Sequence, residues 1–519
     1  MAAVTQPRDA VTENRFTVLT RRLPFAPDPL GLYAAATAES AGASALFETA
    51  DAGARESAES LIFLDACASL TARASEARLE AHDAVGAVLA ERLGTRLTAH
   101  TIPDGDGWRF RYSGPSPCVC DEAARLNEAS VLDPLRALTN GLDCAIPDDA
   151  ARTFAFGCFA YDLLDAFERL PAAASDPTDY PDYTFHLAGS VIRVDHRHAR
   201  TTISVLSAAG DATDARRRLA ELARLCGEGR SYMPAPAAQT TARVRLSDAG
   251  YAEQVERCKR HIETGDVYQI VPSRAWEAPC PDPLAAYARL RAGNPSPYMF
   301  YLDDAAGTLF GASPESALKV DAASRRVEVR PIAGTRPRGE NAESDTRLEL
   351  ELRLSEKELA EHTMLVDLAR NDVARVAVPG TRRVSELMQV ERYSRVMHLV
   401  SRVEGELASG LDALHAYRAT LNMGTLTGAP KLRAAELLRR YEPDRRGPYG
   451  GAVGYLTAAG DLDTAIVIRS ALVRDGVARV QAGAGVVADS EPLAEAEETR
   501  RKAQAVLRAL GAEEEQNHE

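Results

Sequence analysis

The sequence predicts an α+β fold in which antiparallel strand pairs are combined with long helices. Residues 186–206 and 464–487 each contain two apolar segments joined by a polar turn, and the second turn is the hairpin dipeptide Asp475-Gly476. Residues 351–372 contain no Gly or Pro, and residues 490–511 form a helical run that begins near Pro492. Strands that pair through short turns are antiparallel, so hairpins and helices together indicate this class.

Composition limits both the organisation and the partners. The chain has 519 residues, 45% of them hydrophobic and 26% charged, which is typical of a globular protein too long for a single core. Its net charge of -14 argues against nucleic acid as a partner, because an acidic surface does not attract phosphates. An anionic substrate would therefore have to be held by local positive groups.

The cysteines and the N-terminus indicate the compartment. The eight cysteines contain no CxxC pair, so a zinc ribbon or a disulfide framework is not expected. The first residues lack the apolar core of a signal peptide, and no apolar run is long enough to span a bilayer. We expect a cytoplasmic protein that does not act in a membrane.

A compositional break predicts two domains. Residues 231–244, SYMPAPAAQTTARV, are rich in Pro, Ala and Thr and contain little that would pack in a core. We expect an N-terminal domain over 1–240 that ends in this linker, a second domain over 244–511, and a frayed acidic tail over 512–519. Further strands are expected at 308–320 and 325–335, in the second domain.

Both long helices carry pairs of glutamates three residues apart. Glu358 and Glu361 share one face of the helix expected over 351–372. In the helix expected over 490–511, Ser490 is the candidate N-cap and Gly511 the C-terminal glycine, and Glu495 and Glu498 repeat the spacing. Neighbouring carboxylates repel unless a cation such as Mg²⁺ lies between them. A solvated acidic face is the alternative, and the first pair by itself favours it.

One arginine and several glycines among the strands could contact a ligand. Arg469 interrupts the apolar run TAIVIRSALV, so it either forms a structural ion pair or binds a ligand carboxylate. Glycine segments begin at Gly334, Gly424, Gly447 and Gly483. The segment GTLTGAPK lacks the GK[ST] ending of a phosphate loop, which excludes a nucleotide site there. Ordinary turns explain each segment taken alone.

The order of these segments resembles a known family. The strings VYQIVPSR, NPSPYMF, GASPESALKV, PIAGTRPRG, EKELAEHTMLVDLARND, MGTLTGAPK, YGGAVGY and VQAGAGVVADS, followed by EAEETRRKA, resemble the chorismate-utilising enzymes, and among them the component I family of anthranilate synthases. The resemblance covers nearly all of 244–511, and the N-terminal half carries a fainter one. It implies antiparallel sheets packed as a sandwich with helices outside.

The resemblance also implies an activity and its residues. The activity is Mg²⁺-dependent amination of chorismate by ammonia, with loss of pyruvate, to give anthranilate for tryptophan biosynthesis. By motif, Glu361 and Glu498 resemble the principal Mg²⁺ ligands, with Glu358 and Glu495 in support. Glu315 resembles the general acid, and His398 the group that assists removal of the ring proton and of pyruvate. Residues that resemble the chorismate contacts are Gly334, Thr335, Tyr449, Arg469, Gly483, Ala484 and Gly485.

Two positions separate the activities of related enzymes. Relatives that activate water have a lysine where this chain has Gln269, so we expect ammonia as the nucleophile. Aminodeoxychorismate synthases often have a lysine where this chain has Ala333, which favours anthranilate. An aminodeoxychorismate synthase component is the nearer alternative. A non-catalytic amino-acid sensor of the same fold is the more distant one, and the acid, base and metal residues argue against it.

The resemblance further implies a partner and an inhibitor. No cysteine lies in a glycine-rich nucleophile turn, so the chain has no amidase of its own, and a separate glutamine amidotransferase subunit is expected to supply ammonia in a hetero-oligomer. Tryptophan is expected to inhibit allosterically, bound between the N-terminal domain and the PSPYMF segment. Its implied contacts are Thr49, where the family commonly has serine, and Pro297, Tyr298 and Met299.

Overall fold

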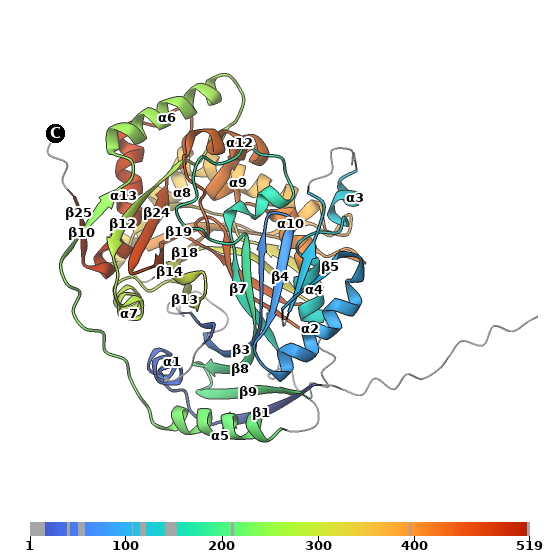
Figure 1. Cartoon of the computed structure of the whole chain (residues 1–519). Helices are drawn as coiled ribbons and strands as arrows, with labels where there is room; N and C mark the ends of the chain where they lie inside the picture. Colours follow the sequence, from blue (N-terminus) through green and yellow to red (C-terminus); the bar gives the residue numbers. More distant parts are fainter. Residues whose placement is uncertain are drawn as a thin grey trace, which may run out of the picture.

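Strands from both halves of the chain hydrogen-bond into one extensive sheet system that is almost entirely antiparallel, with helices on its outside (Figure 1). The computed structural model describes residues 16–38, 42–49, 58–105, 107–114, 121–140, 153–208, 212–393 and 396–515. The predicted α+β class with antiparallel sheets is confirmed. No helix within these ranges is long and apolar enough to cross a membrane.

The first half alternates long strands with short helices. Its strands are β1 (Phe16–Leu23), β2 (Ser44–Glu48), β3 (Glu59–Arg73), β4 (Glu76–Ala81), β5 (Thr101–Asp104), β6 (Gly107–Arg111), β7 (Phe154–Phe159), β8 (Tyr183–Asp195) and β9 (Arg200–Ala208). Its helices are α1 (Pro29–Thr37), α2 (Ala84–Arg96), α3 (Glu122–Leu126), α4 (Asp133–Asn140) and α5 (Thr213–Gly227), with the 3₁₀ helices η2 (Thr98–His100) and η4 (Tyr161–Ala166).

The second half contains the longest helices. Its strands are β10 (Thr240–Val244), β11 (Gln269–Ile270), β12 (Ser273–Pro279), β13 (Tyr298–Asp304), β14 (Gly307–Ser313), β15 (Ser316–Asp321), β16 (Arg326–Val329), β17 (Ile332–Pro337), β18 (Arg383–Arg392), β19 (Val396–Glu406), β20 (Gly428–Ala429), β21 (Ala452–Thr457), β22 (Leu462–Ile466), β23 (Ser470–Arg474), β24 (Val477–Gly483) and β25 (Ala512–Glu514). Its helices are α6 (Asp248–Glu263), α7 (Pro283–Gly293), α8 (Ala342–Leu354), α9 (Glu356–Ala374), α10 (Ala413–Thr420), α11 (Gly424–Thr427), α12 (Lys431–Tyr441) and α13 (Pro492–Leu510).

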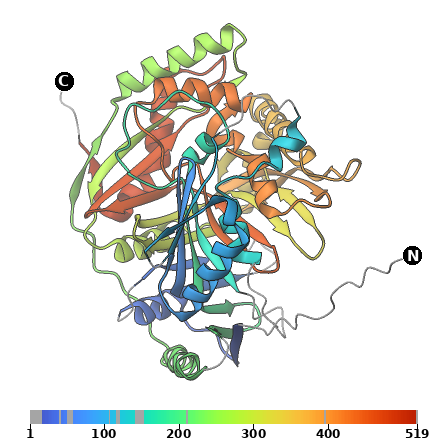
Figure 2. The same cartoon turned by 45° about the vertical axis from the view of Figure 1, so that its right-hand side comes forward.

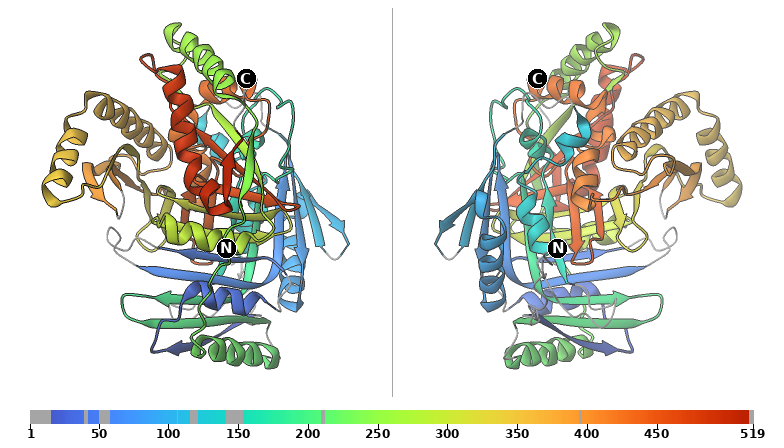
Figure 3. Two further views of the ribbon diagram at one scale, coloured as in Figure 1. Left: turned by 90° about the vertical axis from the view of Figure 1, so that its left-hand side faces the viewer. Right: turned by 90° about the vertical axis from the view of Figure 1, so that its right-hand side faces the viewer.

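The helices cover different outer faces of the sheets. Figure 2 shows α5 and α6 at opposite ends of the molecule, and in Figure 3 the segment that contains α8 and α9, coloured gold, stands out to one side. Helix α13 packs against α6 and against β24. The glutamates of α9 and of α13 therefore belong to two helices that cover different outer faces of the sheet system.

The two halves are joined by strand pairing. Strand β2 pairs with β13, and β7 pairs with β21, so each N-terminal strand lies directly beside a C-terminal one. Side chains from both halves fill the core between them, where the rings of Phe63 and Phe156 stack with centroids 5.1 Å apart in a cluster that includes Phe300 and Leu472.

The predicted linker and tail differ from expectation at their edges. Residues 231–239 form neither helix nor strand, but 240–244 is strand β10, which pairs with β12 and, in parallel, with β25. The first three residues of the predicted acidic tail, 512–514, are therefore an ordered strand. The prediction of a frayed tail missed this strand because Glu513 and Glu514 look solvated in the sequence, although their backbone completes a sheet edge.

Both predicted hairpins are confirmed. Strand β8 pairs with β9, and β23 pairs with β24 through the turn at Asp475 and Gly476, whose φ angles are 50° and 75°. Positive φ at both central residues is the geometry that Asp-Gly turns adopt most readily. Arg469, in contrast, does not lie in a strand: it stands in the break between β22 and β23, with φ of 50°.

The first acidic helix is divided at Ser355. Residues 351–372 were expected to form one helix, but α8 ends at Leu354 and α9 begins at Glu356. The Ser355 side chain accepts a hydrogen bond from the Glu358 backbone and caps α9, and the prediction of one helix overlooked the Ser-x-x-Glu spacing that is typical of a helix start. Glu358 and Glu361 still share α9, in its first turns.

The second acidic helix begins differently from the prediction. Its N-cap is Glu491, and the hydroxyl of Ser490 instead accepts from the backbone of Val487 in the preceding loop. At the other end Gly511 adopts φ of 75° and closes the helix as predicted. Glu495 and Glu498 both lie in the first two turns of α13.

Candidate active site

A cavity of about 570 Å³ lies where α9 and α13 approach the strands of the second half. Nearly all the predicted site residues line it, although they come from eight separate segments of the chain. These residues are Glu315, Gly334, Thr335, Glu358, Glu361, His398, Tyr449, Arg469, Gly483, Gly485, Glu495 and Glu498.

Ala484 is the exception among the predicted substrate contacts. It is buried and does not line the cavity, and its backbone N–H lies 3.2 Å from both the Tyr251 hydroxyl and the Pro272 carbonyl oxygen. The Ala484 backbone N–H is therefore used in hydrogen bonds within the protein. The backbone approaches the cavity instead at Gly483 and Gly485, where a Cβ at Gly485 would lie 2.6 Å from Nε2 of Gln269.

The glutamates gather at one end of the cavity. Burial raises the pKa of Glu361, and repulsion from Glu358 and Glu498 raises it further. Each carboxylate has a protein partner: Arg336 lies 3.1 Å from Glu358, Gln269 donates to Glu361 over 3.3 Å, and Lys502 lies 2.7 Å from Glu498.

This acidic end fits a hard cation by its chemistry. Within the described ranges, no three His, Cys, Asp or Glu side chains are close enough together to hold a metal in their present conformations. The donors are all carboxylate oxygens, however, and the pKa of Glu361, raised first by burial, is raised further by repulsion from Glu358 and Glu498, which a divalent cation would relieve. The carboxylates are held by neighbouring protein groups and do not form a preformed metal cage.

Glu315 is placed to act as an acid. It follows β14 and Pro314, is 8% exposed, and its backbone carbonyl accepts from the Ile466 N–H, which ties it to β22. Burial raises the pKa of Glu315 to about 8, and the nearby charges of Lys502 and Arg469 only partly oppose this. At neutral pH the carboxyl group therefore carries a proton that it can donate.

His398 is placed to act as a base. It lies in β19 opposite Thr335 of β17, and its Nδ1 is 3.0 Å from the Thr335 hydroxyl and 3.3 Å from the Gly334 carbonyl oxygen. Burial lowers the pKa of His398 to about 4, so the ring is neutral at pH 7. A carbonyl oxygen only accepts, so the proton belongs on Nδ1, and Nε2 is left as the acceptor.

Arg469 is the candidate anion-binding group of the cavity. Within the described residues, its guanidinium forms no ion pair or hydrogen bond, and burial lowers the pKa of the side chain. The backbone at φ of 50° is unusual for a residue with a side chain, and such strain is often found at functional sites. Of the two sequence hypotheses for Arg469, the ligand carboxylate is the one that this geometry favours.

Several lining residues were not singled out from the sequence. They are Arg336, Lys357, Thr425, Gln481, Arg501 and Lys502. The position of Lys502, four residues after Glu498, would place both on one helix face, and its ammonium group does reach Glu498 and the Gly483 carbonyl oxygen. For Gln481 the sequence offers only its place two residues before Gly483, on the same face of β24.

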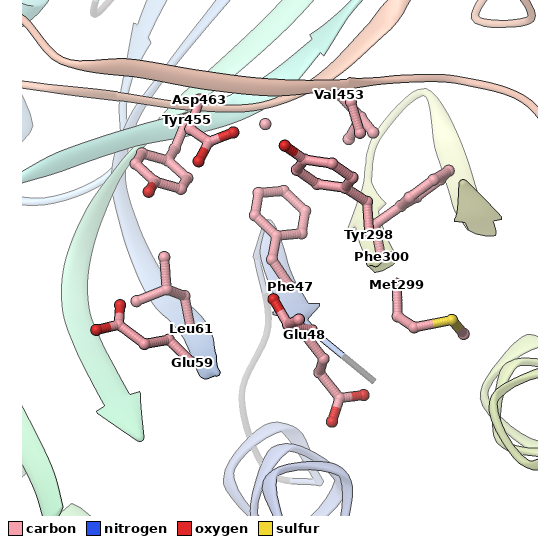
Figure 4. A pocket seen from close by; sticks show the side chains of 13 residues that line it. Phe47, Glu48, Glu59, Leu61, Tyr298, Met299, Phe300, Val453, Tyr455 and Asp463 are labelled. Atoms are coloured by element: carbon pink, nitrogen blue, oxygen red, sulfur yellow. The ribbon is translucent and has the colours of Figure 1, made fainter. Parts of the chain in front are cut away.

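A second, smaller pocket lies between the halves. It is lined by residues of β2, β3, β13, β21 and β22, with Thr49 and Tyr298 among them (Figure 4). The rings of Phe47, Tyr298 and Tyr455 surround it, together with the carboxylates of Glu59 and Asp463.

The predicted contacts of the inhibitor are only partly brought together there. Pro297 does not line the pocket. Met299 does, but side chains alternate along a strand, and that of Met299 belongs to the core cluster on the other face of β13. Glu48 likewise points away, toward Tyr287 and Arg291, with which it bonds.

Comparison with known proteins gives consistent matches over most of the chain. Residues 103–508 match the family described as chorismate binding enzyme. A relative from Vibrio cholerae, "Anthranilate synthase component 1", is 46% identical over 505 residues, covering 95% of this chain and 96% of its own. The Salmonella typhimurium protein of the same name is 48% identical and covers 90% of this chain and 92% of its own.

A solved structure is also similar. The crystal structure of anthranilate synthase component I from Streptococcus pneumoniae superimposes with a TM-score of 0.66 at 29% identity, covering 86% of this chain and 92% of that one. The likeness extends over both halves of the present chain.

Proposed function

The chain belongs to the chorismate-binding enzymes and has the large-subunit role of an anthranilate synthase, and from that premise we propose how its cavity works. The reaction is the addition of ammonia to chorismate with loss of water and pyruvate, which gives anthranilate for tryptophan biosynthesis. One observation carries the proposal. A protonated Glu315 and a neutral His398 line the same cavity, which has carboxylates at one end and Arg469 elsewhere.

The two carboxylates of chorismate are matched by two kinds of group. Arg469, the Tyr449 hydroxyl and the backbone at Gly483 line one part of the cavity and suit the enolpyruvyl carboxylate. At the other end Glu361 and Glu498, supported by Glu358 and Glu495, would hold Mg²⁺, which supplies positive charge for the ring carboxylate. Binding of Mg²⁺ by Glu498 would require the Lys502 ammonium group to move away from that carboxylate.

Glu315 provides the proton for the leaving hydroxyl. Ammonia forms a C–N bond to the ring as the C–O bond breaks, and the proton from Glu315 converts the departing hydroxyl into water. His398 provides the opposite function in the second half of the reaction. Its Nε2 takes the ring proton, and the electron pair left behind aromatises the ring as the bond between the ring and the enolpyruvyl oxygen breaks. The released enolpyruvate takes up a proton at its methylene carbon and becomes pyruvate.

Gln269 favours ammonia over water as the nucleophile. Its amide has no basic nitrogen, so it does not deprotonate water, and it lies against Glu361. Ammonia needs no base to attack. At neutral pH free ammonia is scarce, which supports a glutamine amidotransferase subunit as the partner that supplies it.

A single assay series tests this function. The purified chain, given chorismate, Mg²⁺ and an ammonium salt, should form anthranilate, which is detected by its fluorescence. With glutamine in place of ammonium, product should appear only after the amidotransferase subunit is added. A product that retains its enolpyruvyl group would contradict anthranilate formation and indicate an aminodeoxychorismate synthase component.

A cytoplasmic location is also proposed. The cysteines that the structure describes, Cys67, Cys158, Cys226, Cys258 and Cys280, are buried thiols without disulfides. Free thiols are typical of a reducing compartment.

We further propose that the pocket between the halves binds tryptophan and so inhibits the enzyme. An indole ring would pack among Phe47, Tyr298 and Tyr455. The ammonium group of tryptophan requires an acid. Glu59 is already bound by Arg193 at 3.0 Å, whereas Asp463 has only a longer contact of 3.8 Å from Oδ2 to Lys319, and its Oδ1 is buried without a hydrogen bond. Asp463 is therefore the candidate partner.

Replacement of that acid should weaken inhibition. In Asp463→Asn we expect the tryptophan concentration for half inhibition to rise about tenfold or more, because a charge-assisted hydrogen bond is lost. Anthranilate formation without tryptophan should stay near the wild-type rate. Asp475→Asn, in the exposed β23–β24 turn, is the matched control. An unchanged inhibition curve for Asp463→Asn would remove Asp463 from the proposal, and a wild-type enzyme insensitive to saturating tryptophan would remove the inhibitor.

A further inference from the structure

Gln481 lines the reaction cavity and is held by an unbroken chain of polar contacts that runs into the core. It lies in β24 at the cavity wall, and its side-chain nitrogen Nε2 donates to the Ser273 hydroxyl over 2.8 Å. The neighbouring strand β23 begins beside Arg469, and β14, which leads to Glu315, is the next strand. Gln481, Arg469 and Glu315 all line the same cavity.

The direction of the Ser273 hydroxyl is fixed by an acid. Both the backbone N–H and the hydroxyl of Ser273 lie within hydrogen-bonding distance of Oε1 of Glu442, at 2.7 and 2.8 Å. An ionised carboxylate can only accept a hydrogen bond, so the Ser273 hydroxyl donates its hydrogen to Glu442. The lone pairs of the Ser273 oxygen then face Gln481 and require a donor there.

The charge of Glu442 is fixed in turn by Arg446. The guanidinium binds both carboxylate oxygens at 2.7 Å, and the two side chains are 3% and 8% exposed. The remaining N–H groups of Arg446 donate to the carbonyl oxygens of Leu426 and Val271. A buried, bidentate pair of this kind keeps the acid ionised.

These contacts determine how the Gln481 amide is turned. Its NH₂ group must face Ser273, so its carbonyl oxygen Oε1 is left toward the cavity. Reversing the amide would place two acceptors against each other, since the Ser273 proton is already committed to Glu442. The cavity wall therefore presents a neutral hydrogen-bond acceptor of fixed orientation, in a cavity that is also lined by several charged side chains.

We propose that Gln481 is a specificity-determining residue whose carbonyl oxygen accepts a hydrogen bond from the ring hydroxyl of chorismate. This inference rests on the proposed function. While Glu315 gives its proton to a lone pair of the hydroxyl oxygen, the hydroxyl's own hydrogen needs an acceptor, and Gln481 holds it there. When the C–O bond breaks, water leaves with both hydrogens, and Gln481 neither gains nor loses a proton. The same oxygen disfavours a carboxylate at this place.

The first experiment removes the acceptor. Gln481→Met keeps the length of the side chain but carries no amide, and it should lower kcat/KM for chorismate by about ten- to a hundredfold, as expected when a substrate hydroxyl loses its partner. KM for ammonium should stay within twofold. Gln389→Met, an exposed glutamine of β18, is the matched control. A kcat/KM for chorismate within twofold of wild type, or an effect confined to KM for ammonium, overturns the proposal.

The second experiment tests the chain of contacts behind Gln481. Ser273→Ala leaves the Gln481 side chain in place but frees its amide to turn, so kcat/KM for chorismate should fall by a smaller factor. In the double variant Ser273→Ala/Gln481→Met the effects should not multiply, because Ser273 acts only through Gln481. Multiplicative effects would overturn the orienting role of Ser273. Thermal unfolding identifies a variant that fails to fold, and Gln481→Leu, which likewise carries no hydrogen-bond acceptor, then serves as the second probe with the same expected loss.

Chorismate binding separates this inference from the proposed function. Calorimetric titration with chorismate measures affinity without turnover, and Gln481→Met should bind more weakly than wild type. If wild type forms no anthranilate yet binds chorismate in a Gln481-dependent way, the proposed function fails and the inference stands. If anthranilate forms normally and affinity does not depend on Gln481, the inference fails alone.

Discussion

Glu315→Gln should lose anthranilate formation by about 10²- to 10⁴-fold in kcat, the range typical of removing a general acid. The amide has the shape of the acid but cannot supply the proton that turns the hydroxyl into water. Chorismate affinity should change little, because Glu315 is not among the groups that suit either carboxylate. Anthranilate fluorescence gives kcat, and calorimetric titration gives the affinity.

The pH dependence provides an internal check on Glu315. The pKa of this buried group is raised to about 8, so wild-type kcat should fall as pH rises through 8, where the acid ionises. Ammonium must be adjusted so that free ammonia stays constant. Stability follows the same sign: a carboxyl with a raised folded-state pKa loses its stabilising contribution as pH rises from its unfolded value toward 8. Glu315→Gln should therefore unfold at a higher temperature than wild type at pH 8. A variant that keeps full turnover, or one that is destabilised, would contradict the assignment.

Glu361→Gln should abolish Mg²⁺-dependent turnover, with a loss of about 10²-fold or more, since a direct ligand of a catalytic cation is removed. The measurement is a Mg²⁺ titration of anthranilate formation. Glu356→Gln provides the matched control, because Glu356 is exposed in the first turn of the same helix and does not line the cavity. Turnover and Mg²⁺ dependence that match wild type would mean that Glu361 holds no metal.

Stability again distinguishes this loss from misfolding. The pKa of Glu361 is raised mainly by burial and then by Glu358 and Glu498, so its charged form costs stability as pH rises. Without Mg²⁺ at neutral pH, Glu361→Gln should be at least as stable as wild type. Added Mg²⁺ should raise the unfolding temperature of wild type more than that of the variant.

The sequence was sufficient for local structure where the pattern and the backbone requirement coincide. Asp475-Gly476 demanded positive φ and formed the predicted turn, and the spacing of Glu358 and Glu361 put both on α9. The prediction failed at Ser355, where a side-chain cap divides two helices that have no Gly or Pro between them, although Ser355 and Glu358 have the spacing typical of a helix start. Capping depends on where a backbone N–H happens to be free, which periodicity does not encode.

Within the site, the residue types could be predicted, but their burial, protonation states and contact partners could not. Burial is the main cause that raises the pKa of Glu315 and lowers that of His398, and burial comes from strands distant in the sequence. Whether Arg469 had an acid partner was undecided from its neighbours, because the answer lay in three-dimensional contacts. Ala484 was included with its glycine neighbours, yet its amide bonds to Tyr251, a residue more than two hundred positions earlier.

The pairing of β2 with β13 and of β7 with β21 has a consequence for how such an enzyme can be inherited or divided. A half with an exposed, unpaired sheet edge is prone to aggregation, so neither half is expected to persist as a separate module. Gene fusion can add a domain at either end. Recombination that exchanges one half alone must preserve both strand pairings, β2 with β13 and β7 with β21. The pocket between the halves and the cavity of the second half are therefore expected to be inherited together.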